Sequence, residues 1–156
     1  MKGAILEKQE MYYTYMDLIF ESTNNMETNF NWLITDYECN RYIDPIIFDT
    51  NNNYVWINSE ELHGFLKENR IQFIWGAFIA FDKNIDIDDA LKYDLPRSRK
   101  NFFEDNTIEM QHPLSVVEII AADSTYAFVI SKDEEHIKQF LAWFPLAENL
   151  EVYFGQ

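Results

Sequence analysis

The 156-residue chain contains a single cysteine, Cys39, so it cannot form a disulfide within itself. A fold without disulfides suits a reducing compartment, and we therefore expect the protein in the cytoplasm. Membrane-directing segments are also missing. The apolar run Ala4–Leu6 near the N-terminus is too short for a signal peptide, and no run approaches the ~18 apolar residues that a membrane span needs.

Glycine and proline are scarce, with four residues of each. Four scattered glycines cannot build the glycine-rich loop that cradles phosphates. The scarcity also argues against a loop-dominated protein, and no repeat of fixed period is present. Hydrophobic residues make up 47% of the chain and aromatic residues 17%. This content and length predict a single domain, residues 1–156, with a real core.

Positively charged residues are also scarce. The chain has 12 Lys and Arg and 27 Asp and Glu, which gives a net charge of −15. This balance repels phosphate backbones and anionic membrane surfaces, so we expect neither nucleic acid nor membrane as a partner. It permits a basic protein as a partner. The alternative is that the acidity only keeps an aromatic-rich chain in solution.

Motifs for catalysis and metal binding are missing as well. His63, His112 and His136 lack paired metal-ligand spacing, so each is expected to be structural or exposed. The acidic run 82–89 lacks the glycine and the final glutamate of a calcium loop, and we expect a helix to begin there at Asp86. The sequence does not exclude a catalytic nucleophile–base triad whose members are far apart in the chain. The sequence itself predicts no catalytic residue, no metal and no cofactor.

The spacing of apolar residues predicts the helices and strands. Between Met11 and Phe20 they recur every three or four residues, which predicts an amphipathic helix ending at residues 22–25. Further helices are predicted at 59–69, 86–92 and 133–144, and strands at 3–7, 30–37, 46–48, 54–57, 71–81, 115–122, 126–131 and 150–154. Segments 46–48 and 54–57 are expected to pair as a hairpin.

Two predicted strands carry further detail. Alternation in strand 30–37 would place Phe30, Trp32, Ile34 and Asp36 on one face and Asn31, Leu33, Thr35 and Tyr37 on the other. The run 71–81 is the longest apolar stretch, so it is expected at the centre of the sheet. Gly76 within it predicts a bulge or a close backbone approach.

Residues 115–154 form the clearest unit: a hairpin turning at Asp123–Thr125, a helix from Asp133 that ends before Pro145, and a last strand. Tight connections of this kind imply antiparallel pairing. We therefore predict an α+β fold, with a single largely antiparallel or mixed sheet and about three helices packed on one of its faces.

The least regular region, residues 82–111, is where we would look for a functional surface. It holds the chain's only basic cluster, Arg97, Arg99 and Lys100, which could clamp an anion or a carboxylate, followed by Phe102 and Phe103. These five residues are the candidate binding residues. The competing interpretation is a solvated loop whose charges contact nothing specific.

Two short stretches resemble a known family. Asn31–Ile34 after an amphipathic helix is one, and Asp123–Tyr126 followed by Ile130–Asp133 and the closing helix is the other. With the start Met1–Gly3, they are similar to a small family of acidic proteins from bacilli and related bacteria, catalogued as a domain of unknown function. The resemblance implies no activity and transfers no functional residue. Size, acidity and aromatic content also resemble bacterial immunity proteins that neutralise nuclease toxins.

The first hypothesis is therefore a non-catalytic, acidic protein-interaction module, of which an immunity-type inhibitor of a basic toxin is one form. The alternative is a small-molecule-binding protein or an enzyme, with a cleft walled by Trp32, Trp56, Trp75 and tyrosines. A homo-oligomeric structural role also stays open.

Overall fold

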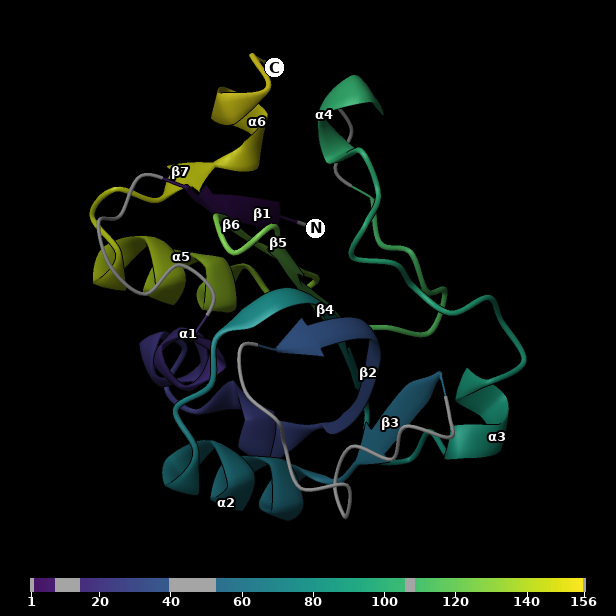
Figure 1. The fold of residues 1–156 in the computed structure, drawn as a ribbon. Helices are drawn as coiled ribbons and strands as arrows, with labels where there is room; N and C mark the ends of the chain where they lie inside the picture. The colour runs from purple at the N-terminus through teal and green to yellow at the C-terminus, as the bar shows by residue number, and fades with distance from the viewer. Residues whose placement is uncertain (1, 8–14, 40–52, 106–108, 156) are drawn as a thin grey trace.

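The protein was studied as a computed structural model, which describes residues 2–7, 15–39, 53–105 and 109–155. These residues form one antiparallel sheet of seven strands in the order β3-β2-β4-β5-β6-β1-β7 (Figure 1). The strands are β1 (Lys2–Leu6), β2 (Asn31–Cys39), β3 (Tyr54–Ile57), β4 (Phe73–Phe81), β5 (Val117–Ala122), β6 (Tyr126–Ser131) and β7 (Glu148–Asn149). The predicted α+β class with a single, largely antiparallel sheet is confirmed.

Helices cover both faces of the sheet, but unequally. The longer ones, α1 (Met16–Ser22), α2 (Ser59–Glu68) and α5 (Glu134–Trp143), pack on one face (Figure 1). The other face is covered by the described residues of the irregular segment 82–116 (82–105 and 109–116), with α3 (Ile87–Ala90) and α4 (Phe102–Asp105), and by α6 (Leu150–Tyr153). The expectation of helices on one face thus holds for the three longer helices only.

A core lies on each side of the sheet because the central strands alternate between apolar side chains that face opposite ways. Strand β4 sits between β2 and β5, as its apolar length predicts, with Phe78 on the side of α1 and Phe81 on the side of segment 82–116. Both rings are essentially unexposed. Within the described ranges, no helix has the length and apolar character to cross a membrane.

The predicted hairpin is confirmed, since β5 and β6 pair down to Ala122 and Tyr126 around the turn. Of the three residues between this last pair, Asp123 and Ser124 adopt left-handed backbone angles, φ 52° and 56°, and the Thr125 amide donates to the Ala122 carbonyl at 3.1 Å across the turn. The predicted starts of three helices are also confirmed. The side chains of Asn58, Asp86 and Asp133 accept hydrogen bonds from the first turns of α2, α3 and α5.

The predicted last strand at 150–154 is wrong. Only Glu148 and Asn149 pair with β1, and the chain then turns into α6 because the Asn149 side chain accepts a hydrogen bond from the Glu151 amide at 2.9 Å. The predicted strand 46–48 and the first four residues of the first predicted helix, 11–14, lie outside the described residues. Within them, β3 pairs with β2, and α1 begins at Met16.

The predicted alternation in β2 fails at Asp36. The ladder between β2 and β4 pairs Thr35 with Ala77 and Glu38 with Trp75, so Asp36 and Tyr37 together face Gly76. This is a β-bulge, and Asp36 takes the left-handed angle φ 47° within it. Asp36 therefore turns to the side of segment 82–116 instead of continuing the face of Trp32. The bulge lies in β2, opposite Gly76, and not at Gly76 itself.

Candidate functional site

Segment 82–116, which carries all five candidate binding residues, is held on the sheet by a buried carboxylate. Glu118 on β5 is 0% exposed. Its side chain accepts hydrogen bonds from the Gln111 amide at 2.9 Å, the His112 amide at 2.9 Å and the Ser115 hydroxyl at 2.8 Å. These three donors satisfy a charge that would be costly to bury unpaired.

His112 extends this anchor to α3. Its Nδ1 accepts from the Leu114 amide at 3.1 Å, so the ring proton is on Nε2, which donates to the Ala90 carbonyl at 2.8 Å. The rings of Phe81 and Tyr93 pack edge-on against the imidazole. His112 is therefore a structural residue, as expected for it from the sequence.

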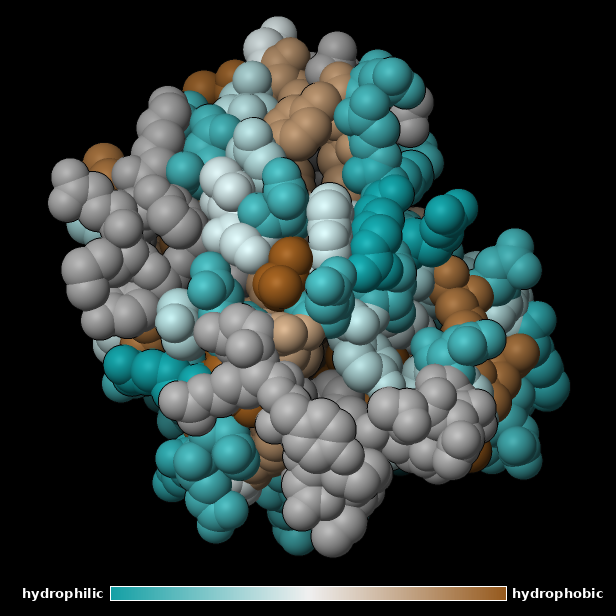
Figure 2. Space-filling view, in the orientation of Figure 1, coloured by the Kyte–Doolittle hydropathy of each residue, from teal (hydrophilic) through white to brown (hydrophobic). Residues whose placement is uncertain are grey.

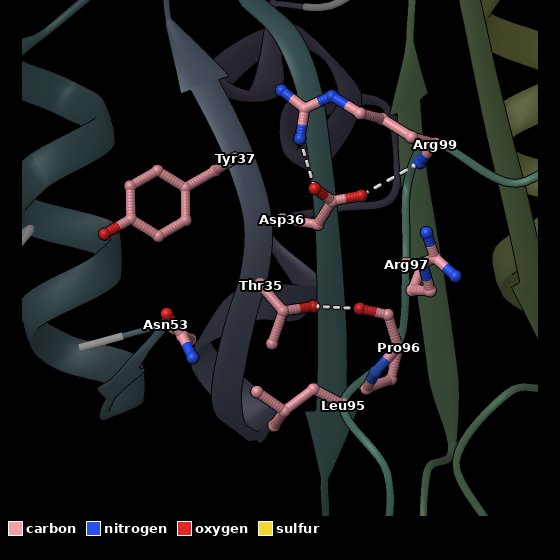
Figure 3. Close-up of a pocket in the computed structure, with 8 residues that line it drawn as sticks. All are labelled: Thr35, Asp36, Tyr37, Asn53, Leu95, Pro96, Arg97 and Arg99. Atoms are coloured by element: carbon pink, nitrogen blue, oxygen red, sulfur yellow. Dashed lines mark hydrogen bonds and ion pairs between the residues drawn. The ribbon is translucent and has the colours of Figure 1, made fainter.

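A second carboxylate fastens the middle of the segment to the bulge in β2 (Figure 3). Asp36 accepts hydrogen bonds from the Ser98 amide, the Ser98 hydroxyl and the Arg99 amide, each at 2.9 Å, and it pairs with the Arg99 guanidinium. The neighbouring Thr35 hydroxyl donates to the Pro96 carbonyl at 2.6 Å. The left-handed turn at Asp36 aims its carboxylate at these donors.

The electrostatics of Asp36 follow from these contacts. Burial alone would raise its pKa, but the hydrogen bonds from Arg99 and Ser98 and the Arg99 charge outweigh burial and hold the pKa below its usual 3.8. Arg99 also pairs with Glu38 at 3.1 Å, and its guanidinium lies over the Trp75 ring at 5.4 Å. Arg99 is thus a structural cation that fastens two parts of the chain.

Beside this anchor lies a cavity of about 480 Å³. It is lined by Thr35, Asp36, Tyr37, Asn53, Leu95, Pro96, Arg97 and Arg99. The backbone of Arg97 forms a reciprocal pair with the Gln111 side chain, at 2.8 and 2.9 Å. Among the described residues, the Arg97 guanidinium has no hydrogen bond or ion pair, so it is available to bind an anion.

The other three candidate residues lie in a different place, on and before α4. The Lys100 ammonium lies over the Phe102 ring at 5.9 Å, and Phe102 packs on Phe128 of β6. Phe103 is 39% exposed and contacts the rings of Tyr126 and Tyr153. The five residues, which are neighbours in sequence, therefore divide between the cavity at Asp36 and an aromatic cluster at α4.

We refer to Phe103, Tyr126 and Tyr153 as the aromatic patch. In Figure 2 a hydrophobic region is visible near the top of the molecule, between the places of α6 and α4 in Figure 1. Phe128 lies underneath and contacts both Phe103 and Tyr126. The patch thus has a rigid base, formed by a strand side chain that is only 2% exposed.

Carboxylates border the aromatic patch. The Tyr153 hydroxyl donates to Glu7 at 3.1 Å, and Glu104 follows Phe103 on α4 with an exposed side chain. Burial first, then the hydrogen bond and charge of Glu7 and the charge of Glu148, raise the pKa of Tyr153 to about 12. These carboxylates favour cationic groups beside the patch.

The tryptophans do not wall a common cleft. Trp32 is 0% exposed in the core beneath α1, whereas Trp56 and Trp75 pack on the opposite face of the sheet. The geometry therefore gives no support to the tryptophan-walled cleft expected as the alternative.

Two potential nucleophiles are held in unreactive settings. The Ser131 hydroxyl lies 2.9 Å from His136 Nδ1, but Ser131 is 0% exposed and accepts the Asp133 amide, which is a local turn contact. Burial lowers the pKa of His136, against the opposing charges of Asp133 and Glu135. Burial and Glu38 raise the pKa of Cys39 to about 12, so its thiol stays protonated.

Sequence reasoning missed both carboxylate anchors and a buried glutamate, Glu27, which contacts His63. For Glu118 the sequence did contain a signal, a single charged residue inside the apolar run 116–122.

Within the described residues, no three His, Cys, Asp or Glu side chains are grouped to hold a metal ion. No protein-family model, curated protein or solved structure matches this chain.

Proposed function

We propose that this protein is an acidic protein-interaction module that binds a basic protein through the aromatic patch. The observation that carries the proposal is the partly exposed Phe103, supported from below by Phe128 and bordered by carboxylates. Aromatic residues are enriched at the centres of protein interfaces, and tyrosine is among the residues that most often supply binding energy there.

The surrounding charge gives the patch its partner preference. Arg and Lys side chains of a partner can stack on the rings of Phe103 and Tyr126 while they pair with Glu7 or Glu104. The Lys100 ammonium over Phe102 is an example of this contact within the chain itself. The net charge of −15 also accelerates encounter with a cationic protein and repels acidic ones.

One form of this function is an immunity-type inhibitor, in which the acidic surface covers the cationic active site of a toxin enzyme. Carboxylates can occupy positions that such an enzyme reserves for phosphates. This narrower proposal requires that the partner is an enzyme and that one equivalent of this protein abolishes the activity of that enzyme.

The test begins with capture of partners on the immobilised wild-type chain and continues with the purified pair. We expect a basic partner whose affinity falls steadily as salt rises, because the ions screen the attraction between opposite charges. Titration of the partner's activity then decides the inhibitory role. A neutral or acidic partner, or an affinity that does not change with salt, would contradict the proposal.

A further inference from the structure

Glu27 is a buried carboxylate with one oxygen left without a partner. Its side chain is 3% exposed, and Oε1 lies 2.7 Å from Nδ1 of His63 on α2. The other oxygen, Oε2, is fully buried and has no hydrogen-bond partner among the described residues. Burying a carboxylate oxygen without a hydrogen-bond donor costs free energy. A bound group that donates a hydrogen bond to Oε2 would remove this cost.

The backbone around Glu27 explains how it comes to be buried. Asn24 and Asn25 both adopt the left-handed region at φ 56°, which turns the chain sharply between α1 and the 3-10 helix η1 (Met26–Asn29). The Trp32 indole then donates to the Glu27 carbonyl at 3.1 Å. These contacts hold the backbone of Glu27 against the core, so its side chain is fixed close to α2.

Glu27 lines a cavity of about 340 Å³ between α1, η1 and α2. The lining residues are Asp17, Phe20, Glu21, Asn25, Glu27, His63, Leu66 and Lys67. They include three carboxylates against one lysine, and Lys67 is exposed. Asp17 is already paired with Arg70 at 3.1 Å. Glu21 and Glu27 thus give the cavity a negative character, and its volume suits a small ligand.

We propose that this cavity binds a small molecule that carries a primary ammonium group. The ammonium is a compact charge with three donors. A small shift of the side chains that cover Glu27 Oε2 would let it donate to that oxygen and neutralise the buried carboxylate. Phe20 and Leu66 offer apolar surface to the carbon chain next to that ammonium. His63 is a positioning residue, because its contact with Oε1 fixes the carboxylate orientation. This site is independent of the aromatic patch and of the proposed partner.

The first test uses the wild-type protein and ligands matched in shape. The side-chain ¹⁵N signals of His63 are followed by NMR while n-butylammonium, n-butanol or butyrate is added. We expect a saturable shift with n-butylammonium and no saturable shift with the neutral alcohol or the anion. An equal response to n-butanol, or no saturable response to n-butylammonium, would overturn the proposal, whatever the behaviour of any variant.

The second test compares two variants with the same change of charge. Glu27→Gln is expected to weaken n-butylammonium binding at least about ten-fold, because the amide cannot neutralise the cation. Glu60→Gln removes an exposed carboxylate on the same helix as His63 but outside the cavity, and its affinity is expected to stay within about two-fold of wild type. Thermal unfolding confirms that both variants fold. Equal affinities in the two variants would contradict the assignment to Glu27.

Discussion

Replacing Glu118 with alanine is expected to lower the free energy of unfolding by at least about 3 kcal/mol. The variant loses three hydrogen bonds at a fully buried site and leaves the amides of Gln111 and His112 without their acceptor, whereas the Ser115 hydroxyl can still donate to the His112 carbonyl at 2.8 Å. Buried donors without partners carry the full cost of lost solvation. The loss is measured by urea unfolding followed by tryptophan fluorescence.

Two further variants test whether the loss of stability comes from the hydrogen bonds of the Glu118 carboxylate. Glu118→Gln keeps the size, but its NH₂ group meets one of the three donors, so it is also expected to destabilise, by about 1–3 kcal/mol. Glu151→Ala is the control. The Glu151 side chain is 46% exposed and makes a surface ion pair with Lys2 at 3.6 Å, so this variant is expected to cost under about 1 kcal/mol. If Glu118→Ala were no worse than Glu151→Ala, Glu118 would not anchor segment 82–116.

Replacing Asp36 with asparagine is expected to lower stability by about 1–2 kcal/mol near neutral pH. Asparagine tolerates the left-handed angle at this position, so the change removes the charge and keeps the backbone. The hydrogen bonds from Ser98 and Arg99 then lose their ionised acceptor. The control is Asp123→Asn, an exposed turn residue with φ 52°, for which we expect little change.

The effect of Asp36→Asn should depend on pH in a defined direction. The pKa of Asp36 is lower in the folded protein than its usual 3.8, so its stabilising effect is present above 3.8 and is lost as pH falls through the folded pKa. The difference in unfolding free energy between wild type and variant should therefore shrink on acidification below 3.8. A difference that is constant across this range would rule out the ionised carboxylate as its source.

Local sequence patterns were sufficient for much of the fold. Hairpin 117–131 has strand-forming residues on both sides of turn residues, and capping side chains such as Asp133 mark helix starts. Such signals are local, and they are read from a few neighbouring residues. The central place of β4 also followed from its composition, because a strand that is buried on both faces has apolar residues throughout.

The anchors of segment 82–116 could not be read in the same way, because they join residues far apart in sequence. Asp36 meets Ser98 and Arg99 only through a bulge opposite Gly76, and an alternating pattern gives no sign of such a bulge. The partner of Glu27, His63, is likewise on another helix. The prediction of a final strand was wrong because the apolar residues at 150–154 are compatible with a strand or a helix. The Asn149 side chain caps the first turn and so favours the helix.

The candidate binding residues illustrate the same limit. Arg97, Arg99 and Lys100 form one cluster in sequence, which suggested one anion clamp. In the fold, Arg99 is paired with Asp36 and Glu38, and Lys100 lies over Phe102. Charge spacing along a loop does not reveal which cations are already paired, so only Arg97 keeps the predicted availability, among the described residues.

The most direct test of the proposed function is the affinity of the purified basic partner for Phe103→Ala and Trp143→Ala, measured by calorimetry. Phe103 belongs to the aromatic patch, whereas Trp143 on α5 is an equally conspicuous ring, 49% exposed, outside it. We expect Phe103→Ala to raise the dissociation constant about ten-fold or more and Trp143→Ala to change it less than about two-fold. Equal effects of the two variants, or unchanged binding by Phe103→Ala, would contradict the account.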